Sequence, residues 1–72
     1  MTQLIQQIVH VRFDGRSEEV TLAQLDLNAQ VTDVQIRRAV EGHFDLPART
    51  LDTHVVVRTS QAIIVRPEAV YG

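Results

Sequence analysis

One segment of the chain, Thr32–Phe44, has the pattern of an amphipathic helix, and it stands between two segments patterned as β-hairpins. Thr32 and Gln35 have the spacing of a capping box, in which each side chain bonds the backbone N–H of the other residue. Pro47 ends the segment, because the residue before a proline avoids the helical conformation. One well-marked helix among strands predicts an α+β domain.

The helix is expected to bury one stripe and to expose the other side. Val31 and Ile36 occupy the two positions of a hydrophobic staple around the cap. The apolar stripe follows at helical spacing and consists of Ile36, Ala39, Val40 and Phe44. The polar side, expected to face away from the core, consists of Arg37, Arg38 and Glu41. The helix end is left between two candidates, Gly42 and Phe44.

The segment before the helix, residues 7–22, alternates as two strands do. Apolar residues share one face of each strand: Val9, Val11 and Phe13, then Val20 and Leu22. A two-residue Asp-Gly turn at positions 14 and 15 would place Val11 opposite Glu18. A four-residue loop over 14–17 would place Val11 opposite Val20, and we favour it because it pairs apolar with apolar.

The segment after the helix, His54–Pro67, predicts a second hairpin with its turn at residues 59–62. Residues 55–57 and 63–65 are apolar on both faces, which is typical of interior strands. The facing of strand 55–58 depends on the length of the turn and is left open. The order is β-β-α-β-β. Ile8-Val9 and residues 63–65 are the strand segments most apolar on both faces, so we expect the first and last strands to lie side by side and parallel at the centre of the sheet.

This arrangement resembles the β-grasp fold of ubiquitin-like proteins, in particular prokaryotic ones such as the sulfur carrier of thiamine synthesis and the small subunit of molybdopterin synthase. The resemblance covers nearly the whole chain and rests on the hairpin Ile8–Leu22, the helix Thr32–Phe44, the loop 45–51 and the closing strand Ala62–Arg66. It implies one helix packed on a four-stranded mixed sheet. It also implies a single domain over residues 1–67 and a flexible tail over residues 68–72.

The functional residue that the resemblance implies is Gly72, the last residue of the sequence. In the family an activating enzyme adenylates this carboxylate, which then passes to a thiol, a sulfide or an amine. Tyr71 stands where the family usually has a second glycine, so the ending departs from the pattern. The alternative is an inert tail on a non-conjugated interaction or scaffold module. The chain has no lysine, so it offers no side-chain amine for building chains of itself.

The face of the sheet away from the helix, which we call the outer face, is the candidate protein-binding surface. Its expected residues alternate with the core positions and are Ile8, His10, Arg12, Ile64 and Arg66. An apolar centre with an arginine rim is typical of interfaces. The alternative is a solvated sheet face with incidental apolar residues.

Several classes of function fit the sequence poorly. The net charge is −2 and there are only three aromatic residues, so we expect no nucleic-acid partner. The three histidines lack metal-pair spacing and there is no cysteine, so we expect no metal, no cofactor and no catalytic residue, hence no enzyme. No apolar run is long enough for a transmembrane helix and no signal-peptide pattern is present, which favours a cytoplasmic location without a membrane partner. The chain is expected to be a monomer, with dimerisation through an exposed edge strand as a weaker alternative.

Overall fold

The computed structural model describes residues 7–68, which form two strands, one helix and two further strands. The strands are β1 (Ile8–Phe13), β2 (Arg16–Thr21), β3 (His54–Arg58) and β4 (Ala62–Pro67), and the helix is α1 (Asp33–His43). The strands form one mixed sheet in the order β2-β1-β4-β3, with β1 and β4 parallel at its centre. The α+β class, the single helix on a four-stranded sheet and the central parallel pair are therefore confirmed. The interior position indicated for residues 55–57 is wrong, because β3 is an edge strand.

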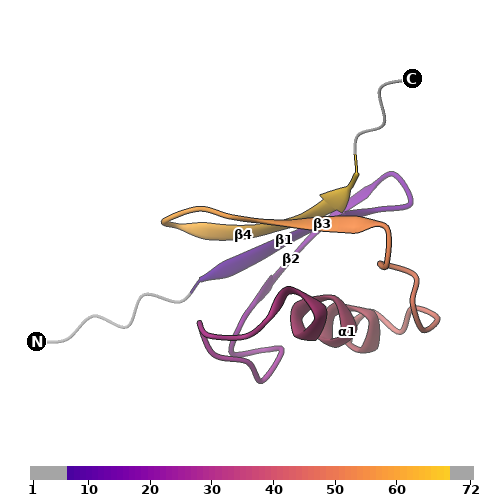
Figure 1. Ribbon diagram of the computed structural model, residues 1–72. Helices are drawn as coiled ribbons and strands as arrows, with labels where there is room; N and C mark the ends of the chain where they lie inside the picture. The colour runs from indigo at the N-terminus through magenta and orange to yellow at the C-terminus, as the bar shows by residue number, and fades with distance from the viewer. Residues whose placement is uncertain (1–6, 69–72) are drawn as a thin grey trace, which may run out of the picture.

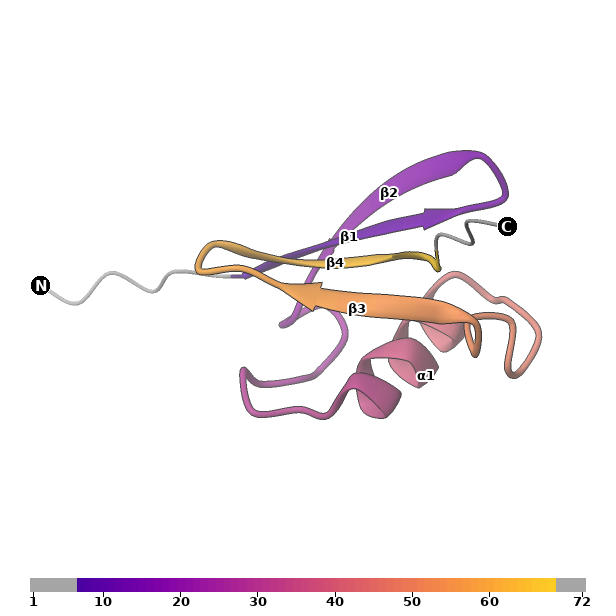
Figure 2. The same cartoon turned by 45° about the horizontal axis from the view of Figure 1, so that its top comes forward.

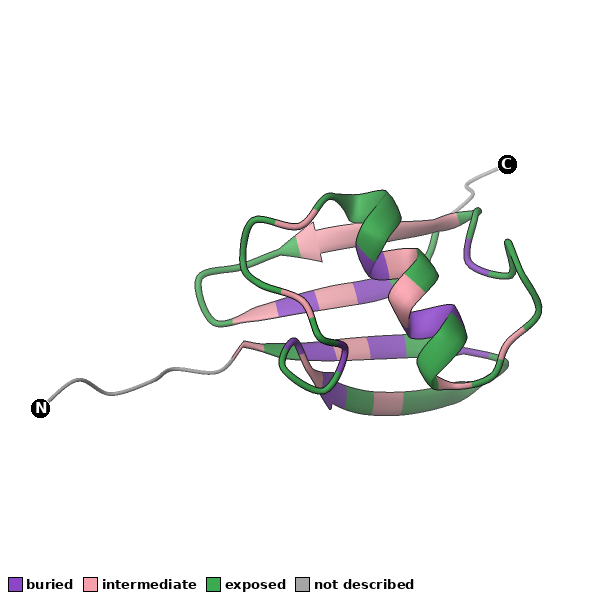
Figure 3. Cartoon of the chain, turned by 90° about the horizontal axis from the view of Figure 1, so that it is seen from below, coloured by how far each residue is buried: buried purple, intermediate pink, exposed green. Residues whose placement is uncertain are grey.

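The molecule has two layers, because α1 covers one face of the sheet and leaves the other uncovered (Figures 1 and 2). The core lies between these layers, and buried residues alternate with less buried ones along β1 and over Ala62–Val65 of β4 (Figure 3). Eleven hydrophobic residues are buried there, four from β1 and β2, two from β4, two from α1 and three from loops: Val9, Val11, Phe13, Val20, Ile63, Val65, Ile36, Val40, Leu22, Leu25 and Leu51.

The helix begins as its sequence predicts. Thr32 is the N-cap: its hydroxyl accepts the Gln35 N–H at 3.1 Å, and the Gln35 side chain accepts the Thr32 N–H at 2.9 Å. The helix runs through Gly42 and its C-cap is Phe44. Asp45 then takes the left-handed conformation, with φ of 58°, and the Leu46 N–H bonds the Glu41 carbonyl at 2.7 Å. Of the two candidates for the end, Phe44 is therefore the correct one, and an aspartate fills the position that usually holds a glycine.

The expected four-residue loop of the first hairpin is wrong. Val11 pairs with Glu18 and Val9 with Val20, so the turn is the two-residue Asp14-Gly15. Asp14 has φ of 50° and Gly15 has φ of 69°. These are the positive angles of a type I′ turn, whose twist matches that of the flanking strands. The conformational preference of the turn residues therefore outweighs the apolar pairing, and Glu18 lies opposite Val11. This position costs Glu18 little, because its side chain is half-exposed and accepts a 3.1 Å hydrogen bond from Arg16.

The expectation that Glu41 faces away from the core is also wrong, because its residue is only 4% exposed. Its neighbour Arg38 is exposed, as expected, but turns back toward Glu41 instead of pointing into solvent. The cause lies outside the helix, in the loop that follows it, and is described with the polar network below.

Candidate functional site

The outer face contains all five residues predicted to bind a protein partner. In β1 the residues Ile8, His10 and Arg12 alternate with buried core residues. The parallel register places His10 level with Ile64, and Arg66 follows on the same face of β4. The sequence-predicted residues therefore lie together on the face of the sheet that α1 leaves uncovered.

Strand β3 adds two valines that the sequence left unassigned. The hairpin register pairs Val57 with Ile64 and Val55 with Arg66, so both valines share the outer face, while Val56 pairs with the buried Val65. The assignment depends on the turn, where Thr59 donates its N–H to the Ala62 carbonyl at 2.8 Å and leaves a two-residue loop. The outer face is thus defined by Ile8, His10, Arg12, Val55, Val57, Ile64 and Arg66.

The outer face changes from apolar to polar across the sheet. One row of paired residues crosses the four strands and shows this change: Val57 on β3, Ile64 on β4, His10 on β1 and Glu19 on β2. His10 Nδ1 lies 3.5 Å from Glu19 Oε1, so the polar end of this row carries a surface pair between strands. Such an exposed pair contributes little to stability, at most about 1 kcal/mol.

An open hollow of about 590 Å³ lies on the outer face over β2, β1 and β4, and its lining residues are His10, Val11, Arg12, Ser17, Glu18, Glu19, Ile64 and Arg66. Arg12 and Arg66 also border a second hollow, of about 320 Å³, at the tip of the first hairpin. Within residues 7–68 neither Arg12 nor Arg66 has a carboxylate within ion-pair distance. Two guanidinium groups beside the apolar centre formed by Ile8, Val57 and Ile64 are therefore available, in this part of the chain, to acidic groups of a partner.

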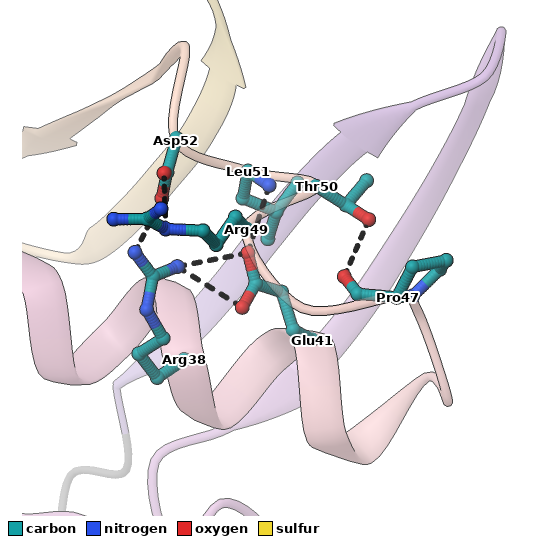
Figure 4. A network of polar contacts seen from close by, with 7 residues as sticks. All are labelled: Arg38, Glu41, Pro47, Arg49, Thr50, Leu51 and Asp52. Atoms are coloured by element: carbon teal, nitrogen blue, oxygen red, sulfur yellow. Dashed lines mark hydrogen bonds and ion pairs between the residues drawn. The ribbon is translucent and has the colours of Figure 1, made fainter.

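A polar network below the sheet holds the loop that leads into β3 (Figure 4). Arg38 Nη1 donates to both carboxylate oxygens of Glu41, at 3.0 and 2.9 Å, and the Leu51 N–H donates to Glu41 Oε2 at 2.8 Å. Arg38 and Arg49 both pair with Asp52. The network thus ties α1 to residues 49–52, and it places Leu51 fully in the core.

The network fixes the charge of Glu41. Burial by itself raises the pKa of the Glu41 carboxyl, but hydrogen bonds from the Leu51 backbone, the Arg38 side chain and the Arg49 backbone outweigh burial and lower the pKa below its ordinary value. The hydrogen bond from Arg38 likewise lowers the pKa of Asp52. Both carboxyls are therefore ionised at neutral pH. Because every member of the network bonds another, we assign it a structural role.

His54 supplies a hydrogen bond that the backbone of the central strand pair, β1 and β4, lacks. Its Nε2 lies 3.1 Å from the Arg12 carbonyl oxygen, and since a carbonyl only accepts, Nε2 is the donor. The register that pairs Val11 with Val65 sets Arg12 level with Arg66. In a parallel pair the N–H of the next residue, residue 67, would donate to the Arg12 carbonyl. Pro67 has no N–H, so the imidazole takes its place. This leaves His54 Nδ1 buried without a partner among the described residues.

Other predicted features fall outside these contacts. Gly72 and Tyr71, the candidate activation residues, lie outside the described residues, as does most of the predicted tail. Within residues 7–68, no group of three or more His, Cys, Asp or Glu residues is placed to hold a metal ion. The helix of this part of the chain is too short and too polar to cross a membrane.

Comparison with family models, with curated proteins and with solved structures finds no match to this chain. The functional interpretation therefore rests on the residues of the chain itself.

Proposed function

We propose that this chain is a small ubiquitin-like protein with a β-grasp fold that acts by binding a protein partner through its outer face. The observation that carries the proposal is the apolar centre formed by Ile64, Val57 and Ile8, on the side of the sheet that α1 leaves uncovered. The strand order β2-β1-β4-β3 with one helix on one face is compatible with the β-grasp fold.

The chemistry of the outer face suggests what it binds. Ile8 is 37% exposed, and Ile64 and Val57 are half-buried only by their neighbours within the sheet. An apolar side chain of a partner can fill this centre while carboxylates of the partner pair with Arg12 and Arg66. Interfaces gain most from such a desolvated apolar centre with arginines at its border. The proposed partner surface is therefore apolar with acidic groups around it.

We further propose that the protein is a carrier or modifier whose Gly72 carboxylate is activated by an adenylating enzyme. This extension rests on the resemblance to ubiquitin-like proteins and on the glycine at position 72. A glycine lacks a side chain and suits passage into a narrow active site. The alternative is a non-conjugated interaction module that uses the same outer face and has an inert tail.

The binding claim is tested with matched variants used as bait in extract of the native host. Ile64→Lys places a charge in the centre of the outer face, whereas Val34→Lys places the same charge on the exposed side of α1, where Val34 is 51% exposed. We expect the native chain and Val34→Lys to capture a partner protein from the extract that Ile64→Lys no longer captures. Equal retention by all three baits would contradict binding through the outer face.

The carrier claim is tested separately by the intact mass of the protein purified from its host. Replacement of an oxygen by sulfur, or a protein adduct, mapped to Gly72 supports a carrier or modifier. Deletion of Tyr71 and Gly72 then abolishes the modification without unfolding the protein. An unmodified carboxylate in every preparation, with and without ATP and host extract, favours the non-conjugated module.

A further inference from the structure

The two edges of the sheet differ sharply in how well they are protected against pairing with another strand. The edge strand β2, with sequence RSEEVT, places charged side chains on both faces. The other edge strand, β3, with sequence HVVVR, has three consecutive valines and neither proline nor lysine. Charged side chains and proline usually prevent an edge strand from pairing with another chain. The edge of β2 is therefore protected against such pairing, whereas the edge of β3 is not.

The backbone of β3 directs specific hydrogen-bonding groups away from the sheet. Two contacts fix the alternation: the Thr59 N–H bonds the Ala62 carbonyl at 2.8 Å, and the Glu68 N–H bonds the Thr53 carbonyl at 3.3 Å. In an antiparallel pair every second residue bonds the neighbouring strand, so Val55 and Val57 face β4. Val56 and Arg58 therefore direct their backbone groups outward, where within residues 7–68 no further strand pairs with β3.

We propose that β3 pairs antiparallel with β3 of a second copy of this chain, with Val56 opposite the partner subunit's Val56 across a two-fold axis. In this register the two Val56 residues exchange both of their backbone hydrogen bonds. The Arg58 N–H bonds the carbonyl of the partner's His54, and the reciprocal bond forms by symmetry. The two sheets then become one continuous sheet of eight strands.

The side chains of β3 suit this register on both faces. Val55 stands opposite the partner's Val57 on the outer face, and the two Val56 side chains meet on the helix side. The charge of Arg58 is already neutralised within its own chain. Its Nη2 donates to Asp33 Oδ1 and to the Val31 carbonyl, each at 2.8 Å. A β-branched residue opposite another is a favourable pair between strands.

The pairing is weak because the shared strand is only five residues long. Contacts of this size fall at the low end of protein interfaces, where association is transient. The chain is then a monomer when dilute, as its sequence suggests, and a dimer when concentrated. The association uses the backbone edge of β3 and is measured on the purified chain alone, so its test is separate from that of partner binding at Ile64.

Analytical ultracentrifugation of the full chain from about 10 µM to about 1 mM tests the association, a range chosen for weak interfaces. We expect the weight-average mass to rise toward that of a dimer. Val57→Lys places one lysine from each subunit close together in the interface. It should weaken dimerisation at least about tenfold, since like charges in a contact are costly. Val57→Thr, which keeps a β-branched side chain, and Ile8→Lys, which adds the same charge two strands away, should both leave it unchanged.

Amide hydrogen exchange over the same concentrations tests the register. The Val56 and Arg58 amides should exchange quickly in the dilute protein and become protected in the concentrated protein. The Val55 and Val57 amides, bonded to β4, should be protected at both concentrations. A monomer at every concentration overturns the proposal, as does a dimer in which Val56 gains no protection or in which Ile8→Lys acts as strongly as Val57→Lys.

Discussion

The carboxylate of Glu41, buried on α1, accepts a 2.8 Å hydrogen bond from the backbone N–H of Leu51, ten residues further along the chain. This contact holds the loop after the helix in place and with it the start of β3. The outer face depends on this placement, because β3 supplies Val55 and Val57 to it.

Replacing Glu41 should therefore destabilise the protein. Glu41→Ala removes the acceptor of a buried N–H and the partner of Arg38, and we expect the free energy of unfolding to fall by about 2 kcal/mol. Glu41→Gln keeps an acceptor for Leu51 and should cost less. Glu19→Ala, which removes an exposed carboxylate, serves as the control and should change stability by at most about 0.5 kcal/mol in chemical denaturation. Equal effects of Glu41→Ala and Glu19→Ala would contradict the structural role of Glu41.

The same network predicts how stability depends on pH. The pKa values of Glu41 and Asp52 are lower in the native state than their ordinary values of 4.5 and 3.8, so the unfolded chain binds more protons in acid. Their contribution to stability is present above these ordinary values and is lost as the pH falls through the lower native ones. Thermal unfolding measured from neutral to acidic pH should show this loss. A Glu41→Gln, Asp52→Asn double variant should show a smaller loss, and an unchanged acid dependence would refute the assignment.

Two glycines provide an opposed pair of alanine substitutions. Gly15 has φ of 69° in the hairpin turn, with no atom within 4 Å of an added Cβ, so Gly15→Ala is penalised by backbone conformation alone, by about 1 kcal/mol. Gly42 lies inside α1, also with open space around an added Cβ. Gly42→Ala should stabilise the protein by about 0.5 kcal/mol, because alanine favours the helix. Urea midpoints of both variants test the opposite signs, and a stabilising Gly15→Ala would show that the two-residue turn is wrong.

The role of His54 as a substitute for a missing backbone donor can be isolated by a double-mutant cycle. His54→Ala leaves the Arg12 carbonyl without its donor and should cost about 1 kcal/mol. Pro67→Ala restores an N–H at the position that faces this carbonyl. In the Pro67→Ala background His54→Ala should therefore cost clearly less. Additive effects of the two substitutions on the free energy of unfolding would show that they do not share this acceptor.

Sequence patterns predicted those parts of the fold that depend on local chemistry. The capping box of Thr32 and Gln35 is set by residues three positions apart, and both of its bonds are present. The central position of β1 and β4 was predicted from apolar residues on both faces at Ile8, Val9 and residues 63–65. The same pattern at residues 55–57 misled, because β3 is an edge strand. The alternation of β1 then placed Ile8, His10 and Arg12 on the outer face.

The failures came where two preferences competed or where a distant contact decided. At the first hairpin the positive φ angles favoured by Asp14 and Gly15 outweighed the pairing of Val11 with Val20. The burial of Glu41 depends on Leu51 and on the path of a loop, which helical periodicity does not contain. The one local signal was Arg38, three residues before Glu41, at a spacing that suits an ion pair.

The measurement that tests binding through the outer face most directly is a methyl NMR spectrum of the chain, labelled at isoleucine and valine, in extract of its host. Ile8 and Ile64 report on the outer face, Ile36 and Ile63 on the core, and Val34 on the exposed side of α1. We predict that the signals of Ile8 and Ile64 shift or broaden first, while those of Ile36, Ile63 and Val34 keep their positions. No change at Ile8 and Ile64, or a change that begins at Val34, would contradict the proposed function.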